Sequence, residues 1–312
     1  CEQPRQRHRL VRGDALVTAR LQATAAPATV SDVIETTATA IRARGLDVGY
    51  GRNVIVPGID LELQAGGSLA LVGTNGSGKS TLIKTLVGLL PPAGGALDVL
   101  GAAPGKVPGR IAYHAQFHSS GYILPIRVID VVRMARYPSL GLLRRLGSRD
   151  HELVDEAMGR MGITRLARAP MRSLSGGQLQ RVYLAQVLAR EADLIVVDEP
   201  TAGIDAGGRE LYLDAFAAEL QRGAAIVTAT HDIAEAVEYD QVLLLAGRVV
   251  ALGPGSEVLT PDRLMETFGI VIRDPHAEHA GRFTVAEVAH GSPQTIETRC
   301  QDDEDETNVT TD

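Results

Sequence analysis

The sequence predicts an α/β fold in which a parallel sheet is combined with an antiparallel β subdomain and a helical subdomain. Three observations carry this prediction. The apolar runs Leu194 to Val197 and Ala225 to Thr230 are typical of strands buried on both faces of a parallel sheet. Short strand-like segments crowd residues 46–63, and helical patterns fill the region of about residues 117–180.

One large domain, residues 45–272, is expected between two tails. Residues 1–44 are rich in Ala, Thr and Arg, and nothing in them predicts packing. We therefore expect a disordered N-terminal tail, in which Ser31 to Ala43 could form a short helix. Residues 273–312 are expected to be a polar, acidic C-terminal tail.

The antiparallel subdomain comes first along the chain. Its strands are expected at residues 46–50, 54–56 and 59–63, with a turn at 51–53. The apolar run Leu69 to Val72 then enters a glycine-rich loop, and helical spacing from Ser80 to Leu90 ends at two prolines. Further helices are expected at 128–136, 150–161 and 178–190, and a β-hairpin at 242–252.

The net charge of −7 arises mainly at the C-terminal end. Of the 38 acidic residues, six lie in residues 301–312, where there is no basic residue, which leaves 32 acidic against 31 basic residues in the rest of the chain. A nucleic-acid-binding domain is expected to carry a basic patch or stripe. This near-neutral body gives no such sign, and we expect no nucleic acid partner.

Cysteine usage and hydropathy predict a cytoplasmic chain. The two cysteines, Cys1 and Cys300, lie at opposite ends of the sequence, which argues against a disulfide framework. No apolar run reaches the length of about 18 residues that indicates a membrane-spanning helix. The arginine-containing N-terminal region also lacks the apolar run of a signal peptide.

A phosphate-binding loop is predicted between the strand at 69–72 and the helix that follows it. The run Gly73-Thr74-Asn75-Gly76-Ser77-Gly78-Lys79-Ser80 matches G-x-x-x-x-G-K-[ST]. Glycines let backbone N–H groups approach a phosphate, Lys79 supplies a positive charge, and Ser80 offers a hydroxyl group to Mg²⁺. The flanking strand and helix are the context that this motif requires.

Two carboxylates, Asp198 and Glu199, follow the apolar run Leu194 to Val197. At the carboxyl end of a parallel strand they are expected to lie beside the phosphate-binding loop, where one can hold Mg²⁺ and the other can act as a base. His231 directly follows the next apolar run, Ala225 to Thr230. These residues predict hydrolysis of a nucleotide phosphate.

A second glycine-containing motif, Leu174-Ser175-Gly176-Gly177-Gln178, precedes a helical pattern. The N-terminus of a helix can accept an anion, so this motif predicts a second phosphate-binding element. A simple helix cap by Ser175 is the alternative.

The order and spacing of these motifs resemble the ABC transporter ATPase family. Besides the motifs above, the chain has Gln116 in Tyr113-His114-Ala115-Gln116, and Ala202-Gly203-Ile204-Asp205 after the two carboxylates. The resemblance covers Leu46 to about Ile272. It implies a P-loop NTPase fold of the ABC-ATPase type and ATP hydrolysis coupled to transport.

The resemblance also implies a role for each residue. Glu199 would polarise the attacking water and His231 would bond the γ-phosphate. The expected catalytic residues are Glu199, His231, Lys79 and Gln116, and the expected Mg²⁺ ligands are Ser80, Gln116 and Asp198. The expected ATP-binding residues are Tyr50, which would stack on adenine, Gly73, Thr74, Asn75, Gly76, Ser77, Gly78, Lys79, Ser80, Thr81, Ser175, Gly176, Gly177 and Gln178.

The second motif would act on ATP held by another chain. By the resemblance, two cassettes form a homodimer around two ATP molecules, and Asp205 lies at their interface. A buried strand tyrosine is the alternative for Tyr50.

Residues 122–145 resemble the manganese and zinc (and iron) importer ATPases. They read Y-I-L-P-I-R-V-I-D-V-V-R-M-A-R-Y-P-S-L-G-L-L-R-R, and those importers have V-x-D-V-V-x-M-G-R-Y-P. The resemblance implies a divalent metal ion as cargo, integral-membrane permease subunits as partners at the cytoplasmic face of the membrane, and indirectly an extracytoplasmic metal-binding protein.

Two other functions stay open. Siderophore importers share the R-Y-P element, so a siderophore or cobalamin importer ATPase is the first alternative, and a soluble ABC ATPase of Fe–S assembly is the second. The histidines of the C-terminal tail, His276, His279 and His290, are more often simply solvated in such a segment, and we predict no metal ligand there.

Overall fold

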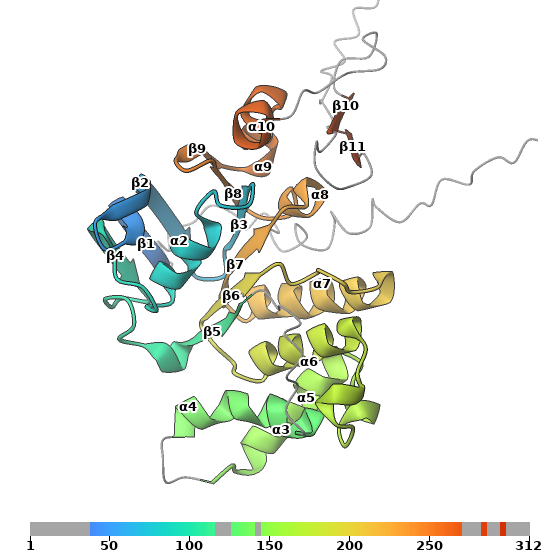
Figure 1. Ribbon diagram of the computed structural model, residues 1–312. Helices are drawn as coiled ribbons and strands as arrows, with labels where there is room; N and C mark the ends of the chain where they lie inside the picture. The colour runs from blue at the N-terminus through green and yellow to red at the C-terminus, as the bar shows by residue number, and fades with distance from the viewer. Residues whose placement is uncertain (1–37, 116–125, 141–144, 270–281, 286–293, 298–312) are drawn as a thin grey trace, which may run out of the picture.

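A computed structural model of the 312-residue chain describes residues 38–115, 126–140, 145–269, 282–285 and 294–297. Its centre is a six-stranded sheet with the order β5-β6-β7-β3-β8-β9 (Figure 1). Neighbouring strands are parallel except for β8 and β9, which form the antiparallel hairpin expected from the sequence. The strands are β5 (Ile111–His114), β6 (Leu194–Asp198), β7 (Ala225–Thr230), β3 (Ser68–Gly73), β8 (Gln241–Leu245) and β9 (Val249–Gly253).

The middle strands of this sheet are buried along their whole length. Every residue of β3, β6 and β7 is buried. Side chains therefore meet apolar neighbours on both faces, which is why these strands appear in the sequence as unbroken apolar runs rather than as an alternating pattern.

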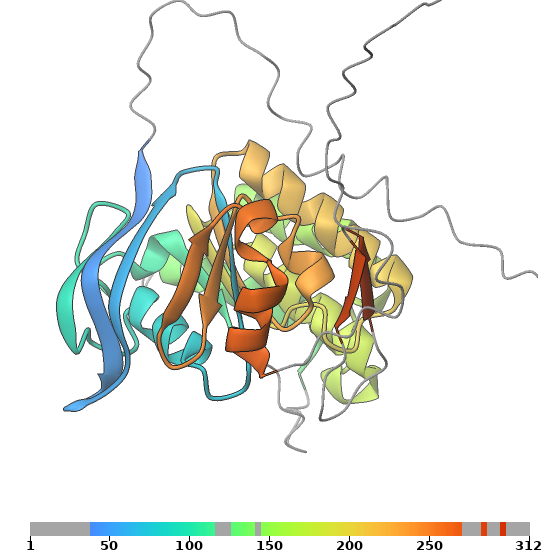
Figure 2. The same cartoon turned by 90° about the horizontal axis from the view of Figure 1, so that it is seen from above.

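A second, three-stranded antiparallel sheet has the order β2-β1-β4 and lies to one side of the first (Figure 2). Its strands are β1 (Thr39–Tyr50), β2 (Asn53–Gln64) and β4 (Gly94–Val99). The sequence predicted two short strands where β2 is one strand of 12 residues. Gly58, with φ +64°, lets this strand continue through the irregularity after Pro57.

The start of β1 corrects the expected domain boundary at residue 45. Residues 39–44 are not part of a tail or a short helix but belong to β1, where Ile41 pairs with Leu63 of β2 and with Val99 of β4. Ala40, Ile41 and Ala43 are buried there. Burial of these apolar side chains stabilises the strand although arginines interrupt its sequence.

Alternate residues of the central strands divide between two cores. Leu69, Leu71 and Val196 pack with the antiparallel sheet and with α2 (Lys79–Leu86). Ala70 and Val197 point to the other face and pack with the helices α6 (Gly176–Leu188), α7 (Ala206–Gln221) and α8 (Ile233–Ala236). The sheet thus holds α2 on one face and α6 to α8 on the other.

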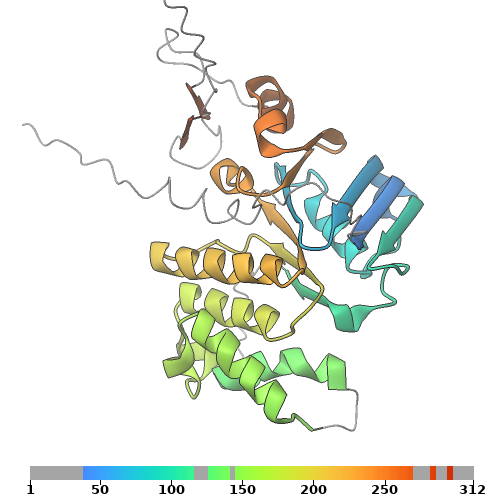
Figure 3. The ribbon, with the colours of Figure 1, turned by 180° about the vertical axis from the view of Figure 1, so that it is seen from behind.

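The helical subdomain extends the second core away from the sheet (Figure 3). Its described elements are α3 (Val128–Arg133), η2 (Met134–Arg136), α4 (Tyr137–Leu140), α5 (Ser148–Arg160), η3 (Thr164–Leu166), η4 (Met171–Ser173) and α6. The remaining short elements are η1 (Pro108–Arg110), α9 (Gly255–Val258), α10 (Pro261–Phe268) and the separate hairpin of β10 (Arg282–Val285) with β11 (Gln294–Glu297). Within the described residues, no helix has the length and apolar character to cross a membrane.

Candidate nucleotide-hydrolysis site

The predicted phosphate-binding loop joins β3 to α2, and two of its glycines lie where no larger residue fits. A Cβ atom on Gly73 would lie 2.2 Å from the carbonyl oxygen of Leu245, and one on Gly78 would lie 2.3 Å from Cγ2 of Val56. Gly78 also has φ +107°, a conformation that side-chain-bearing residues rarely adopt. The two glycines let the loop pass between β8 and β2.

The outer and inner parts of the loop differ in exposure. Thr74, Asn75 and Gly76 face the solvent, whereas Ser77 is buried. The N-terminus of α2 has no side-chain cap, so its first N–H groups remain available to an anion. The buried Oγ of Ser77 has no hydrogen-bond partner within the described part of the chain. A phosphate group with its several acceptor oxygens suits these donors.

Lys79 and Thr81 are buried at the start of α2. Nζ of Lys79 donates to the carbonyl oxygens of Gly73 and Thr74 at 2.7 and 3.0 Å. Burial lowers the pKa of this ammonium group, against the opposing effect of the nearby Asp198 and Glu199 carboxylates. Its positive charge is thus held on the inner side of the loop.

Asp198 ends β6 and lies against the start of α2. Its Oδ2 accepts a hydrogen bond from Oγ of Ser80 at 3.0 Å. Burial raises the pKa of the Asp198 carboxyl, although the Ser80 bond and the positive charge of Lys79 act in the opposite direction. A carboxylate and a hydroxyl group at this separation are hard oxygen donors, which fit Mg²⁺.

Glu199 adopts φ +50°, which is uncommon for a residue with a side chain. Its backbone N–H donates to the carbonyl oxygen of Ala229 at 2.9 Å, so β7 helps to hold this conformation. Its Oε1 lies 3.5 Å from Nδ1 of His231, and the two side chains are 15% and 62% exposed. Backbone strain of this kind is found where the surrounding structure holds a functional side chain in place.

Glu199 and His231 line a cleft of about 200 Å³. Ala202 and Ile204 of this cleft belong to the predicted motif that ends at Asp205, whereas no role was predicted for the remaining lining residues, which only their proximity to Glu199 and His231 in the sequence could have indicated. The complete set of further lining residues is Thr201, Ala202, Ile204, Arg209, Thr230 and Asp232.

The second predicted phosphate-binding element lies at the start of α6. Oγ of Ser175 accepts from the N–H of Gln178 at 3.3 Å, and Oε1 of Gln178 accepts from the N–H of Ser175 at 3.0 Å. This reciprocal pair is a capping box, and it leaves Ser175 and Gly176 exposed. A Cβ atom on Gly177 would lie 2.9 Å from the carbonyl oxygen of Gly203, so the motif packs against the segment that leads to Asp205.

The structure therefore brings Lys79, Ser80, Asp198, Glu199 and His231 to one edge of the sheet. Among the hydrogen bonds of the described residues, none joins Ser175 or Gln178 to this group. Tyr50 is at the end of β1 and is 49% exposed, so it is not a buried strand tyrosine.

Not every predicted site residue belongs to the part of the chain that the structure describes. Gln116, residues 122–125 and 141–144, and the three tail histidines lie outside the described residues. Within the described part of the chain, no group of three or more His, Cys, Asp or Glu side chains could hold a metal ion together.

Comparison with known proteins finds related ATP-binding proteins of transport systems. The family model of the ABC transporter matches residues 56–202. The manganese transport system ATP-binding protein MntB of Bacillus subtilis is 37% identical over 223 residues, which cover 71% of this chain and 89% of that protein. The zinc transport system ATP-binding protein TroB of Treponema pallidum is 35% identical, with 76% and 89% covered.

Two further matches extend the comparison. The hemin import ATP-binding protein HmuV of Streptomyces coelicolor is 40% identical over 256 residues, which cover 80% of this chain and 90% of that protein. A solved structure of a metal-chelate type ABC transporter in an inward-facing conformation matches with a TM-score of 0.66 and 26% identity, covering 84% of this chain and 98% of that one.

Proposed function

Because the chain belongs to the ABC transporter family as an ATP-binding, ATP-hydrolysing subunit of an importer, we propose that its cargo is a divalent metal ion, manganese or zinc. The observation that carries this proposal is the segment Val128 to Pro138 on α3, η2 and α4, which resembles the corresponding segment of manganese and zinc importer ATPases. Similarity to ATP-binding proteins of manganese and zinc transport systems over 71% and 76% of this chain also supports it.

In the proposed mechanism Glu199 is the base. Its carboxylate polarises the attacking water, and His231, 3.5 Å away, orients that water and bonds the γ-phosphate of ATP. Lys79 contributes positive charge to the β- and γ-phosphates, and the N-terminus of α2 contributes N–H groups. Gln116, which lies outside the described residues, is proposed to complete this group.

Ser80 and Asp198 are proposed to hold Mg²⁺, together with Gln116. Bound Mg²⁺ neutralises charge on the phosphate groups of ATP. The hydrogen bond between Ser80 and Asp198 keeps both oxygen donors at the same place before the ion binds. Tyr50, half exposed at the end of β1, is proposed to stack on adenine.

A homodimer is proposed to complete each site. Ser175, Gly176, Gly177 and Gln178 form the N-terminus of α6, which can accept an anion, and ATP held by the phosphate-binding loop of a second chain would supply the phosphate. Asp205 caps α7 through the N–H of Gly208 at 2.9 Å, and it would lie at the same interface.

The proposed permease contact lies on the helical subdomain. Met134 and Tyr137, only three positions apart, are 44% and 52% exposed, so this subdomain presents two large apolar side chains to a partner. They belong to the segment that resembles metal importers, so an integral-membrane permease at the cytoplasmic face of the membrane would cover them. An extracytoplasmic metal-binding protein would deliver the ion to that permease.

A second candidate cargo is an iron chelate. The 40% identity with a hemin import ATP-binding protein favours this alternative. The ATPase mechanism would be the same, and only the permease and its cargo would differ.

The cargo is tested by deleting the gene and measuring growth and cellular metal. We expect growth under manganese or zinc chelation to fail, the added ion to restore it, and cellular content of that ion to fall by mass spectrometry. Lys79→Ala should fail to complement, whereas Lys84→Ala, which removes a lysine from the same helix outside the loop, should complement. Unchanged manganese and zinc contents with impaired use of hemin or siderophores would instead establish the second candidate.

A further inference from the structure

Glu235 is a buried acidic residue without a role in the mechanism above. It lies on α8, four residues after His231, and is 1% exposed. An acidic side chain is almost never fully buried unless polar partners satisfy it. Three hydroxyl groups lie within hydrogen-bond distance of the Glu235 carboxylate, one from the distant Thr201 and two from the nearby Thr230 and Tyr239.

The first partner of Glu235 lies in the segment that follows Glu199. Oγ1 of Thr201 donates to Oε2 of Glu235 at 2.9 Å. Thr201 also begins the turn toward Asp205, because its carbonyl oxygen accepts from the N–H of Ile204 at 3.2 Å. Glu235 is thus bonded to the loop that connects Glu199 with the proposed dimer interface.

The second partner of Glu235 lies beside His231. Oγ1 of Thr230 is 3.5 Å from Oε2 of Glu235 and accepts the N–H of Asp232 at 3.0 Å. Asp232 in turn caps α8 by accepting the N–H groups of Ala234 and Glu235 at 2.9 and 3.2 Å. Both neighbours of His231 in the sequence are therefore held by the network around Glu235.

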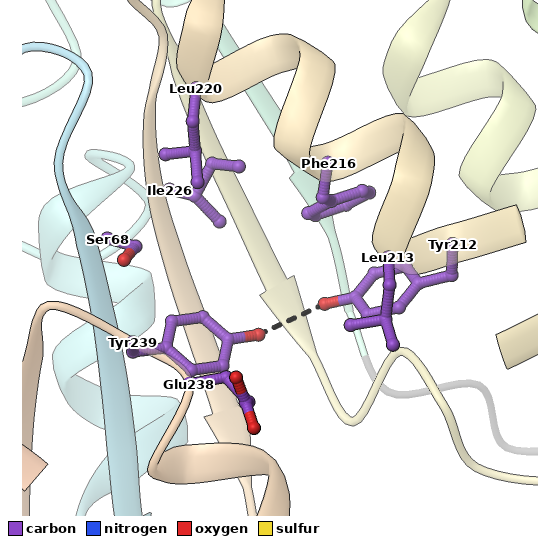
Figure 4. A pocket seen from close by; sticks show the side chains of 8 residues that line it. All are labelled: Ser68, Tyr212, Leu213, Phe216, Leu220, Ile226, Glu238 and Tyr239. Carbon is purple, nitrogen blue, oxygen red and sulfur yellow. Dashed lines mark hydrogen bonds between the residues drawn. The ribbon is translucent and has the colours of Figure 1, made fainter. Parts of the chain in front are cut away.

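The third partner connects Glu235 to α7. The hydroxyl group of Tyr239 donates to Oε1 of Glu235 at 3.4 Å and lies 3.1 Å from the hydroxyl group of Tyr212. Figure 4 shows these two tyrosines pointing toward each other from α7 and from the segment after α8. Burial raises the pKa of both phenols, so both keep their protons and can donate at neutral pH.

An ion pair also joins α7 to the segment that contains Glu235, nearer the surface of the protein. Nη2 of Arg209, in the first turn of α7, donates to Oδ2 of Asp232 at 3.4 Å. The segment Thr201 to Asp205 with α7 and the segment Thr230 to Tyr239 are thereby connected at three places. Such a connected set moves as one unit more readily than its members move separately.

We propose that Glu235 is a positioning residue that couples the segment Thr201 to Asp205 to His231, so that contact with a second copy of this chain sets the position of His231 relative to Glu199. The inference rests on the proposed roles of Glu199, His231 and the homodimer. In the isolated chain the same network keeps the two catalytic side chains at the edge of their shared cleft.

The experiment alters a partner of Glu235, because removal of Glu235 itself would leave a void and several unpaired hydroxyl groups. Thr201→Val keeps the shape of the side chain but deletes the hydroxyl donor. We expect kcat for ATP hydrolysis by the full chain to fall about tenfold, because a displaced catalytic group slows the chemical step. We expect KM for ATP to change by less than about twofold, because the phosphate-binding loop is untouched.

Thr201→Ser is the matched control, since it retains the donor, and its kcat should stay close to that of the wild type. Tyr239→Phe deletes the hydroxyl donor to the other carboxylate oxygen of Glu235, and its kcat should also fall at unchanged KM. If Thr201→Val does not fold, Tyr239→Phe tests the coupling through Glu235 in its place. The inference is overturned if Thr201→Val has wild-type kcat, if Thr201→Ser loses as much activity as Thr201→Val, or if folded Tyr239→Phe is fully active.

ATP hydrolysis by Glu199→Gln, measured in parallel, distinguishes a failure of the proposed catalytic site from a failure of the coupling through Glu235. If Glu199→Gln hydrolyses ATP normally, the proposed catalytic site itself is wrong. If Glu199→Gln is inactive while Thr201→Val hydrolyses ATP normally, the site stands and the coupling through Glu235 is wrong.

Discussion

Oγ of Ser80 donates a hydrogen bond to Oδ2 of Asp198 at 3.0 Å and so joins two residues that are 118 positions apart in the sequence. The bond holds the start of α2 against the end of β6. Burial disfavours the charge of Asp198 and raises the pKa of its carboxyl. The negative charge of Asp198 thus lowers the free energy of unfolding, and residues that lower stability in this way are common at functional sites.

Asp198→Asn should raise the thermal unfolding temperature at neutral pH and abolish Mg²⁺-dependent ATP hydrolysis. The amide keeps the size of the side chain and an acceptor for Ser80, but it removes the buried charge. Because the pKa of Asp198 is raised in the folded protein, wild-type stability falls as the pH rises from the usual value of 3.8 through the raised pKa. The increase in unfolding temperature of Asp198→Asn should therefore be largest above the raised pKa of Asp198, and it should vanish near and below about pH 4.

Unfolding is measured by circular dichroism without nucleotide, at both pH values. Asp155→Asn, which removes an exposed carboxylate from α5, is the control and should shift the unfolding temperature little. A lower unfolding temperature of Asp198→Asn at neutral pH would show that the buried charge is stabilising, contrary to this account.

Tyr50→Ala should weaken ATP binding by about tenfold, since stacking of a base on an aromatic ring contributes roughly 1–3 kcal/mol. Tyr50→Phe keeps the ring and should bind ATP nearly as the wild type does. Both affinities are measured by isothermal titration calorimetry with the hydrolysis-deficient Glu199→Gln background. Equal affinities of the alanine and phenylalanine variants would exclude adenine stacking at this position.

Ser175→Arg should abolish hydrolysis while the phosphate-binding loop of the same chain still binds ATP. Mixing it with Lys79→Ala protein should restore activity, because one site of each mixed dimer would combine an intact loop with an intact Ser175 motif. Ser173→Arg, on the exposed η4 turn two residues earlier, is the control for an added arginine. A mixture no more active than either parent would contradict the composite site.

The central strands and the phosphate-binding loop could be predicted from the sequence because their signals are local. Burial on both faces makes β7 an unbroken apolar run, and its predicted and observed bounds, Ala225 to Thr230, agree. Helix α6 begins two residues before its predicted start, at Gly176. Glycines are poor helix formers, and the capping box of Ser175 and Gln178 stabilises them here.

Other features depend on contacts that are distant in sequence and gave no local signal. Strand β4 contains two glycines and no clear alternation, and its pairing with β1 is what defines it. At the start of β1, Arg42 and Arg44 interrupt the apolar pattern. The sequence therefore did not indicate that Ala40, Ile41 and Ala43 are buried there. The bond between Thr201 and Glu235 spans 34 residues, so only the fold brings this network beside Glu199 and His231.

ATP hydrolysis by Glu199→Gln shows directly whether Glu199 activates the attacking water. The substitution keeps the size of the side chain and leaves the loop and Mg²⁺ ligands in place. We expect phosphate release to fall by at least about 100-fold, because general-base catalysis contributes a factor of this order. ATP binding should remain, and ATP should trap a dimer on size-exclusion chromatography. Phosphate release close to the wild-type rate would contradict the account.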